Sequence, residues 1–184
     1  KFGSASIAIA EKLKKVADIA VKDYGNIIVL SSIKGTAEAL TEISNYLSKK
    51  NQEGAIEIIN KLEKEYFNLA SALFSKESYL SDAKSIISDK FDYIRTFTKD
   101  LFTLFEERIV LAQGELLSTE LFHLYLRERG VKTIIIPALS FIRTDKNAQP
   151  DPVYIKEKLT ALIDAAEDVD LYITQGYICR NAYG

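Results

Sequence analysis

Four short segments of the sequence combine glycine with hydroxyl or amide side chains, a combination suited to binding an anion. They are residues 3–6, residues 31–36, the stretch after Pro137 and residues 175–177. Glycine lets backbone N–H groups approach a phosphate or carboxylate closely, and the start of a helix presents such groups in a favourable field. Each segment alone is also what an ordinary strand-to-helix turn requires. The chemistry therefore depends on whether the fold brings the four segments together.

Two charged residues stand beside these segments. Lys1 precedes the first of them, and Glu115 follows a Gln-Gly pair. A lysine ammonium can neutralise the charge of a phosphate, and a carboxylate can receive an ammonium through a charge-assisted hydrogen bond. Each also has a purely structural interpretation. Lys1 can be a surface cation, and Glu115 can be a favourable acid in the first turn of a helix expected over residues 115–129.

Short apolar runs predict the strands that position these segments. Continuous apolar runs at residues 26–32, 131–139 and 170–178 are typical of parallel strands covered on both faces, and residues 1–3 resemble the end of a fourth strand. In open parallel sheets the ligand site lies beyond the carboxyl ends of the strands. The four segments are therefore expected at one edge of a single sheet.

Between the expected strands, the spacing of apolar residues predicts helices. Asp151 followed by Pro152 predicts a helix start, and Gly130 after basic residues predicts a helix end. Together these patterns favour an α/β fold, a three-layer α/β/α sandwich with a mainly parallel sheet and a helical insert at about residues 52–112. Apolar residues at 3.6-residue spacing predict the helices. One is expected to start near residue 7 and another at Pro152, and the others are expected over residues 37–47, 56–73, 85 to about 111, and 115–129.

Composition narrows the classes of function. The chain has 184 residues, 47% of them hydrophobic, and a net charge of -2. This balance lacks the basic excess that binding to nucleic acid or anionic membranes requires. No apolar run approaches the roughly 20 residues of a bilayer span. The single cysteine, Cys179, cannot form an internal disulfide, so we expect a cytoplasmic protein in which Cys179 is a small core residue.

The order and spacing of five motifs resemble the aspartate kinases of the amino acid kinase family. The third and fifth motifs are the most specific, and the resemblance spans essentially the whole chain. The motifs are Lys-Phe-Gly at residues 1–3, Val-Leu-Ser-Ser-x-x-Gly-Thr at 29–36, Gln-Gly-Glu-Leu-Leu-Ser-Thr at 113–119, Arg-Thr-Asp at 143–145 and Ile-Thr-Gln-Gly-Tyr-Ile at 173–178.

The resemblance implies transfer of the γ-phosphoryl group of ATP, with Mg²⁺, to the β-carboxylate of L-aspartate. This reaction is the first step of lysine, threonine and methionine biosynthesis. Lys1 matches the family lysine that acts electrostatically on the phosphates, and Gly3 and Ser4 fall in the phosphate-binding turn. No residue of the chain is expected to ligate a metal. A homodimer is expected for the family.

The same resemblance assigns the aspartate pocket. Glu115 matches the acid that receives the amino group of aspartate, and Ser31, Gly176 and Tyr177 match residues that line the substrate. Thr36 is also expected at the substrate, in place of a family hydroxyl that this chain lacks. The loop at 143–145 resembles a family Arg-Thr pair, for which a structural role and a site role remain open.

Two departures from the family pattern leave alternatives open. The family usually shows Lys-Phe-Gly-Gly-Thr-Ser and Gly-x-Thr-Asn, whereas this chain has Ser4 and Ala5 in the first motif and Ala37 and Glu38 in the second. Thr36 can replace the lost hydroxyl only through a small shift. The alternatives are a non-catalytic homologue that keeps the scaffold for amino-acid binding or subunit association, and an amino acid kinase with a different acceptor.

The resemblance also predicts what lies beyond the given sequence. A Gly-Arg-Gly-Gly-Ser-Asp stretch, the rest of the nucleotide-binding half and regulatory domains are expected to follow. The chain is therefore interpreted as the amino-terminal, aspartate-binding part of the kinase domain, which is expected to be inactive alone.

Overall fold

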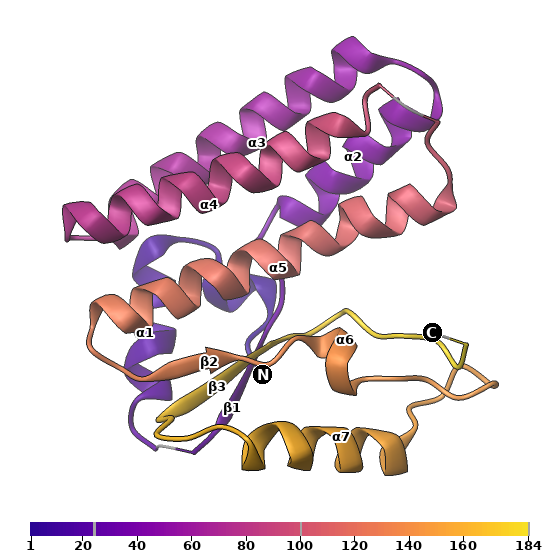
Figure 1. Cartoon of the computed structure of the whole chain (residues 1–184). Coiled ribbons are helices and arrows are strands. Elements are labelled where there is room, and N and C mark those ends of the chain that lie inside the picture. Colours follow the sequence, from indigo (N-terminus) through magenta and orange to yellow (C-terminus); the bar gives the residue numbers. More distant parts are fainter. Residues whose placement is uncertain (24, 100, 184) are drawn as a thin grey trace.

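A small parallel sheet lies between two layers of helices (Figure 1). The computed structural model describes residues 1–23, 25–99 and 101–183. The strands are β1 (Ile27–Leu30), β2 (Thr133–Ile135) and β3 (Leu171–Gln175), in the order β1-β3-β2. They confirm the three predicted apolar strands, with shorter bounds.

The amino-terminal segment runs beside β1, as predicted for residues 1–3. Phe2 forms a parallel bridge with Leu30, its N–H donates to the carbonyl of Val29 at 2.9 Å, and its carbonyl accepts from Ser31 N–H at 3.2 Å. Leu30 is in register with Gln175, the last residue of β3. The chain segments that follow Phe2, Leu30 and Gln175 therefore leave the sheet at the same edge.

Helices cover both faces of the sheet and complete a three-layer α/β/α fold, as predicted (Figure 1). One face carries α5 and α1, the other carries α7, and α2, α3 and α4 stack beyond α5. The helical elements are the 3-10 turn η1 (Ser4–Ile7), α1 (Ala10–Ala20), α2 (Thr36–Ser48), α3 (Gln52–Leu73), α4 (Glu77–Thr96), α5 (Leu104–Glu128), α6 (Ala138–Phe141) and α7 (Pro152–Asp164).

The central strand explains why its sequence is apolar without alternation. Every residue of β3 is buried. Leu171 and Ile173 point into the large core shared with α5, whereas Tyr172 joins a smaller cluster with Ile155 and Leu159 of α7. A strand packed on both faces has no polar side to present, so period-two alternation is absent.

Two predicted helices have the wrong bounds. A helix from residue 85 to about 111 and another over 115–129 were expected, but the chain leaves the helix after Thr96 and a single helix, α5, covers Leu104–Glu128. Thr103 starts α5 through a capping box. Its hydroxyl accepts from Phe105 N–H at 3.2 Å, and the carboxylate of Glu106 accepts from Thr103 N–H at 2.8 Å.

This correction changes the status of Glu115. It lies in the middle of α5 rather than in a first turn, so the interpretation of Glu115 as an acid at a helix start is wrong. A second expectation also fails, because Cys179 is exposed and does not belong to the core. Within the described ranges, none of the helices carries an apolar stretch long enough to cross a bilayer.

Candidate functional site

The four glycine- and hydroxyl-containing segments meet at the carboxyl edge of the sheet, as the sequence predicted. Gly176 N–H donates to the carbonyl of Leu30 at 2.8 Å, which ties the end of β3 to the end of β1. The N–H of Ala138, the residue after Pro137, donates to the side chain of Gln175 at 2.8 Å. Phe2 is bridged to Leu30, so residues 1–3 join the same edge.

Glu115 reaches this edge from α5. Its side chain is buried, and Oε1 accepts a hydrogen bond from Ser32 N–H at 3.2 Å. One turn further along the helix, the hydroxyl of Ser118 donates to the carbonyl of Ser31 at 2.8 Å. Side chains in the middle of α5 therefore bind the backbone of the loop after β1 twice, at the N–H of Ser32 and at the carbonyl of Ser31.

Burial governs the charge of Glu115. It raises the pKa of the carboxyl group above the ordinary value, and the hydrogen bond from the Ser32 backbone offsets only part of this rise. None of the salt bridges in the part of the chain that the structure describes involves Glu115. A buried carboxylate without a cationic partner is a site at which an incoming ammonium gains a strong, charge-assisted contact.

Gly114 permits this close approach. A Cβ at position 114 would lie 2.9 Å from Cβ of Ser32 and 3.2 Å from Cγ2 of Thr36. Such distances leave no space for a side chain, so only glycine allows α5 to pass this close to the loop. The Gln-Gly pair before Glu115 is thus a packing feature inside a helix and not a turn.

The predicted aspartate-pocket residues on the strand ends differ in their surroundings. Ser31 is half-buried beside Glu115's partner Ser32. Gly176 packs so closely on β1 that an added Cβ would lie 3.0 Å from the carbonyl oxygen of Leu30. Tyr177 is 86% exposed. The structure thus places Ser31, Gly176 and Tyr177 at the same edge as Glu115.

Thr36 lies deeper than the other predicted pocket residues. Its side chain is buried, and its hydroxyl is 2.8 Å from the hydroxyl of Tyr66 in α3. Burial raises the pKa of Tyr66 far above the usual tyrosine value. Gly35 precedes Thr36 in the left-handed conformation, with φ of 89°, and so sets the start of α2. The Thr36 hydroxyl therefore already has a hydrogen-bond partner, Tyr66 of α3.

The predicted phosphate-binding residues are exposed. Lys1, Gly3 and Ser4 lie on the surface next to the loop after β1, because Phe2 between them is bridged to Leu30. Nothing lies within 4 Å of the position that a Cβ on Gly3 would occupy. Space for a ligand therefore exists above this turn.

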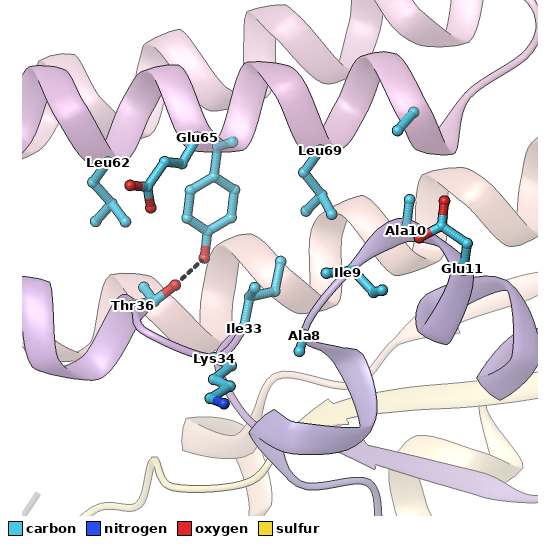
Figure 2. A pocket seen from close by; sticks show the side chains of 12 residues that line it. Ala8, Ile9, Ala10, Glu11, Ile33, Lys34, Thr36, Leu62, Glu65 and Leu69 are labelled. Atoms are coloured by element: carbon cyan, nitrogen blue, oxygen red, sulfur yellow. Dashed lines mark hydrogen bonds between the residues drawn. The ribbon is translucent and has the colours of Figure 1, made fainter.

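A cavity of about 270 Å³ lies between α3, the start of α1 and the loop after β1 (Figure 2). Leu62, Glu65 and Leu69 of α3 face Ile33 and Ile9 across it. The walls are mostly apolar, and Thr36 and Tyr66 in its lining satisfy each other. Glu115 does not line this cavity, so the buried acid at the sheet edge, rather than the cavity, is the chemically distinctive feature.

Arg143 has a structural environment. Its guanidinium forms a 2.5 Å salt bridge with Asp151, the residue that caps α7, and lies 3.9 Å from the centre of the Tyr154 ring. The hydrogen bond from Arg143 holds the pKa of Asp151 below its usual value. These contacts favour the structural role among the two that the sequence left open.

Three polar residues of the site fall in the segments singled out from the sequence, but the sequence assigned no individual role to them. Ser118 and Thr119 lie one turn beyond Glu115 on the same face of α5, a spacing that the sequence contains. Gln175 is a buried amide at the end of an otherwise apolar strand. Among the described residues, no group of three or more His, Cys, Asp and Glu side chains is arranged to hold a metal ion.

The fold and the site define the class of the protein. The chain belongs to the amino acid kinase family, whose sequence model matches residues 1–184. Lysine-sensitive aspartokinase 3 of Escherichia coli (strain K12) is 24% identical over 185 residues, which cover 97% of this chain and 40% of that relative. The chain therefore spans less than half the length of the curated relative that it matches.

Solved structures agree on the fold. Escherichia coli aspartokinase III in complex with aspartate and ADP superposes with a TM-score of 0.77 at 22% identity, covering 100% of this chain and 41% of that one. Clostridium acetobutylicum aspartate kinase superposes with a TM-score of 0.72 at 17% identity, covering 100% of this chain and 39% of that one.

Proposed function

We propose that this chain is the aspartate-binding part of an aspartate kinase, which in its full-length form phosphorylates the β-carboxylate of L-aspartate to give 4-phospho-L-aspartate. The observation that carries the proposal is Glu115, a buried carboxylate at the carboxyl edge of the sheet. No salt bridge within the described ranges neutralises it. The family membership supports the kinase class.

In this proposal Glu115 receives the ammonium group of aspartate. Its pKa, raised by burial in the free protein, falls when the ammonium binds, because a neighbouring positive charge favours the carboxylate. Ser31, Gly176 and Tyr177 lie at the same edge and line the rest of the substrate. Thr36 contributes only if its hydroxyl can contact the substrate while it is bonded to Tyr66.

The phosphoryl group is transferred at the exposed turn of residues 1–4. A β-carboxylate oxygen of aspartate attacks the γ-phosphorus of ATP, the bond from that phosphorus to the bridging oxygen breaks, and ADP leaves with the electron pair. Lys1 neutralises charge on the transferring group, and Gly3 and Ser4 lie against the phosphates. Lys1→Ala in the full-length protein is expected to lower kcat more than it raises KM.

Mg²⁺ belongs to the proposed reaction as the companion of ATP. The described residues provide no cluster that fits a metal ion, so we assign no ligand to it in this chain and draw no step through it. The pathway role in lysine, threonine and methionine biosynthesis, a homodimer and a cytoplasmic location complete the proposal.

A second function is favoured by one pair of observations. Thr36 is already bonded to Tyr66, and Glu38 adds an exposed negative charge to the first turn of α2. The first withdraws a hydroxyl donor from the substrate and the second places a negative charge near the reacting anionic groups, so both disfavour phosphoryl transfer at this loop. The alternative is a non-catalytic homologue that binds an amino acid or a partner subunit.

Hydroxylamine trapping distinguishes the two. The full-length protein is incubated with ATP, Mg²⁺, aspartate and hydroxylamine, and the aspartyl hydroxamate is quantified against a reaction without aspartate. The kinase produces hydroxamate only with aspartate present. Aspartate binding by calorimetry without any hydroxamate would instead establish the non-catalytic homologue.

A further inference from the structure

Gln175 uses both ends of its side-chain amide at the carboxyl edge of the sheet. It is the last residue of the central strand and is 2% exposed. Its Oε1 accepts from Ala138 N–H at 2.8 Å, and its Nε2 donates to Oγ1 of Thr119 at 3.0 Å. The orientation of the amide follows from chemistry, because a backbone N–H can only donate and must therefore face the oxygen.

These bonds close a circuit around the proposed aspartate pocket. Thr119 Oγ1 lies 2.9 Å from the carbonyl of Glu115, so Gln175 is connected through Thr119 to the helical turn that carries the acid. On the other side Gly176 N–H binds the carbonyl of Leu30. The loop after Leu30 then returns to α5 through Ser32 N–H and Glu115.

This circuit of hydrogen bonds connects the two walls of the proposed pocket. One wall is the α5 turn with Glu115, and the other is the Gly176 and Tyr177 segment that follows β3. Gln175 is the side chain that bonds across from β3 both to α5 and to the start of α6. We propose that Gln175 is a positioning residue, which sets the distance between Glu115 and the residues after β3 that meet the substrate; this inference rests on the proposed function.

The neighbouring strand residue provides a matched control. Thr174 is also 2% exposed, but its Oγ1 has no hydrogen-bond partner among the described residues. Thr174→Val keeps the shape and removes a hydroxyl that bonds nothing, so it leaves the circuit intact. Gln175→Met nearly keeps the shape but removes both bonds of the amide.

The test uses full-length protein and two readouts. Gln175→Met is expected to raise the KM for aspartate at least tenfold while the KM for ATP changes less than threefold, and Thr174→Val is expected to change neither. Thr119→Val should raise the aspartate KM as Gln175→Met does, Thr119→Ser should retain wild-type values, and the double variant Gln175→Met with Thr119→Val should be no worse than Gln175→Met. An aspartate KM within twofold of wild type in Gln175→Met would overturn the proposal.

The second readout does not depend on catalysis. Hydrogen exchange measured by mass spectrometry is expected to accelerate at least tenfold in Gln175→Met in peptides that cover Gly176–Tyr177 and Ser31–Ser32, and to stay unchanged in Thr174→Val. Unchanged exchange in Gln175→Met would overturn the positioning role even if the wild-type protein makes no aspartyl phosphate. If the wild-type protein makes no aspartyl phosphate, the proposed function fails, and faster exchange in Gln175→Met would then still show that Gln175 holds the two walls of the site together.

Discussion

The backbone N–H of Ser32 donates a hydrogen bond to Oε1 of Glu115 at 3.2 Å, across a separation of 83 residues in the sequence. This bond joins the loop after the first strand to the middle of the longest helix. It leaves the rest of the Glu115 carboxylate for another donor. A substrate ammonium can take that place.

Neutralising Glu115 is expected to weaken aspartate binding selectively. A hydrogen bond between charged groups contributes about 1.5–3 kcal/mol, so Glu115→Gln should raise the aspartate KM by roughly 10- to 150-fold. Steady-state kinetics of full-length protein measures this effect. Glu120→Gln is the control, because Glu120 lies on the same helix and pairs with Lys90 at 2.9 Å. Equal KM values for wild type and Glu115→Gln would show that Glu115 only supports the Ser32 N–H.

Stability should depend on pH through the same carboxyl group. Burial raises the pKa of Glu115, so the folded state prefers the neutral acid. The difference in the free energy of unfolding between wild type and Glu115→Gln should therefore favour wild type most below the ordinary glutamate pKa. This advantage of wild type should be lost as pH rises through the raised pKa of the folded state. Denaturant unfolding of both proteins from pH 4 to pH 8 measures the difference. A difference that is constant with pH, or one that grows with pH, contradicts a raised pKa.

Gly114→Ala is expected to destabilise the protein despite the better helix propensity of alanine. The gain in propensity is about 1 kcal/mol, whereas overpacking typically costs about 1–3 kcal/mol. The clash is with Cβ of Ser32 at 2.9 Å, which cannot rotate away. Thermal unfolding should therefore show a lower Tm, whereas Gly3→Ala, with nothing within 4 Å, should not lower it by steric conflict. A higher Tm for Gly114→Ala would mean that α5 and the loop can separate without loss.

The hydroxyl pair of Thr36 and Tyr66 should behave as one unit. Tyr66→Phe removes one partner and leaves the buried Thr36 hydroxyl unpaired, at a cost of about 1–3 kcal/mol. Thr36→Val should cost a similar amount, and the double variant should cost less than the sum of the two. Unfolding free energies of the four proteins form the cycle. Additive costs would show that the two hydroxyls do not interact.

Much of the fold could be predicted from local pattern. The runs that became β1, β2 and β3 are apolar without alternation, which is the signature of a strand between two helical layers. Asp151 and Pro152 start α7 as expected, and the Asp151 side chain accepts from Tyr154 N–H at 3.1 Å. Capping and two-sided burial are local properties, so a single sequence contains them.

The predicted helix bounds were wrong where helical spacing of apolar residues continued beyond the end of a helix. Phe97, Leu101, Leu104 and Phe105 keep helical spacing, yet the chain leaves the helix after Thr96, and Leu101, Leu104 and Phe105 are exposed. The Thr103-x-x-Glu106 capping box was present in the sequence and would have located the start of α5. The helix was expected to begin at residue 115, after Gly114, whereas Gly114 lies inside α5 and permits a tertiary contact that spacing alone cannot reveal.

The site was predictable only in part. Glu115, Ser31 and Gly176 could be assigned by resemblance, and the structure places them at one edge. Gln175 lies in the predicted segment 175–177, but its role could not be assigned, because it depends on Ala138 and Thr119, which approach it only in the folded chain. Thr36 and Tyr66 likewise become partners only through the packing of α3 on α2.

The proposed contact between Glu115 and the substrate ammonium is tested by comparing aspartate with succinate, which has both carboxylates but no amino group. The measurement is the ratio of kcat/KM for the two acceptors, in full-length wild type and in Glu115→Gln, by hydroxamate formation. Wild type is predicted to prefer aspartate by at least tenfold, and Glu115→Gln is predicted to lose most of this preference. A wild-type preference that is unchanged in Glu115→Gln, or no aspartate-dependent product in wild type, would contradict the account.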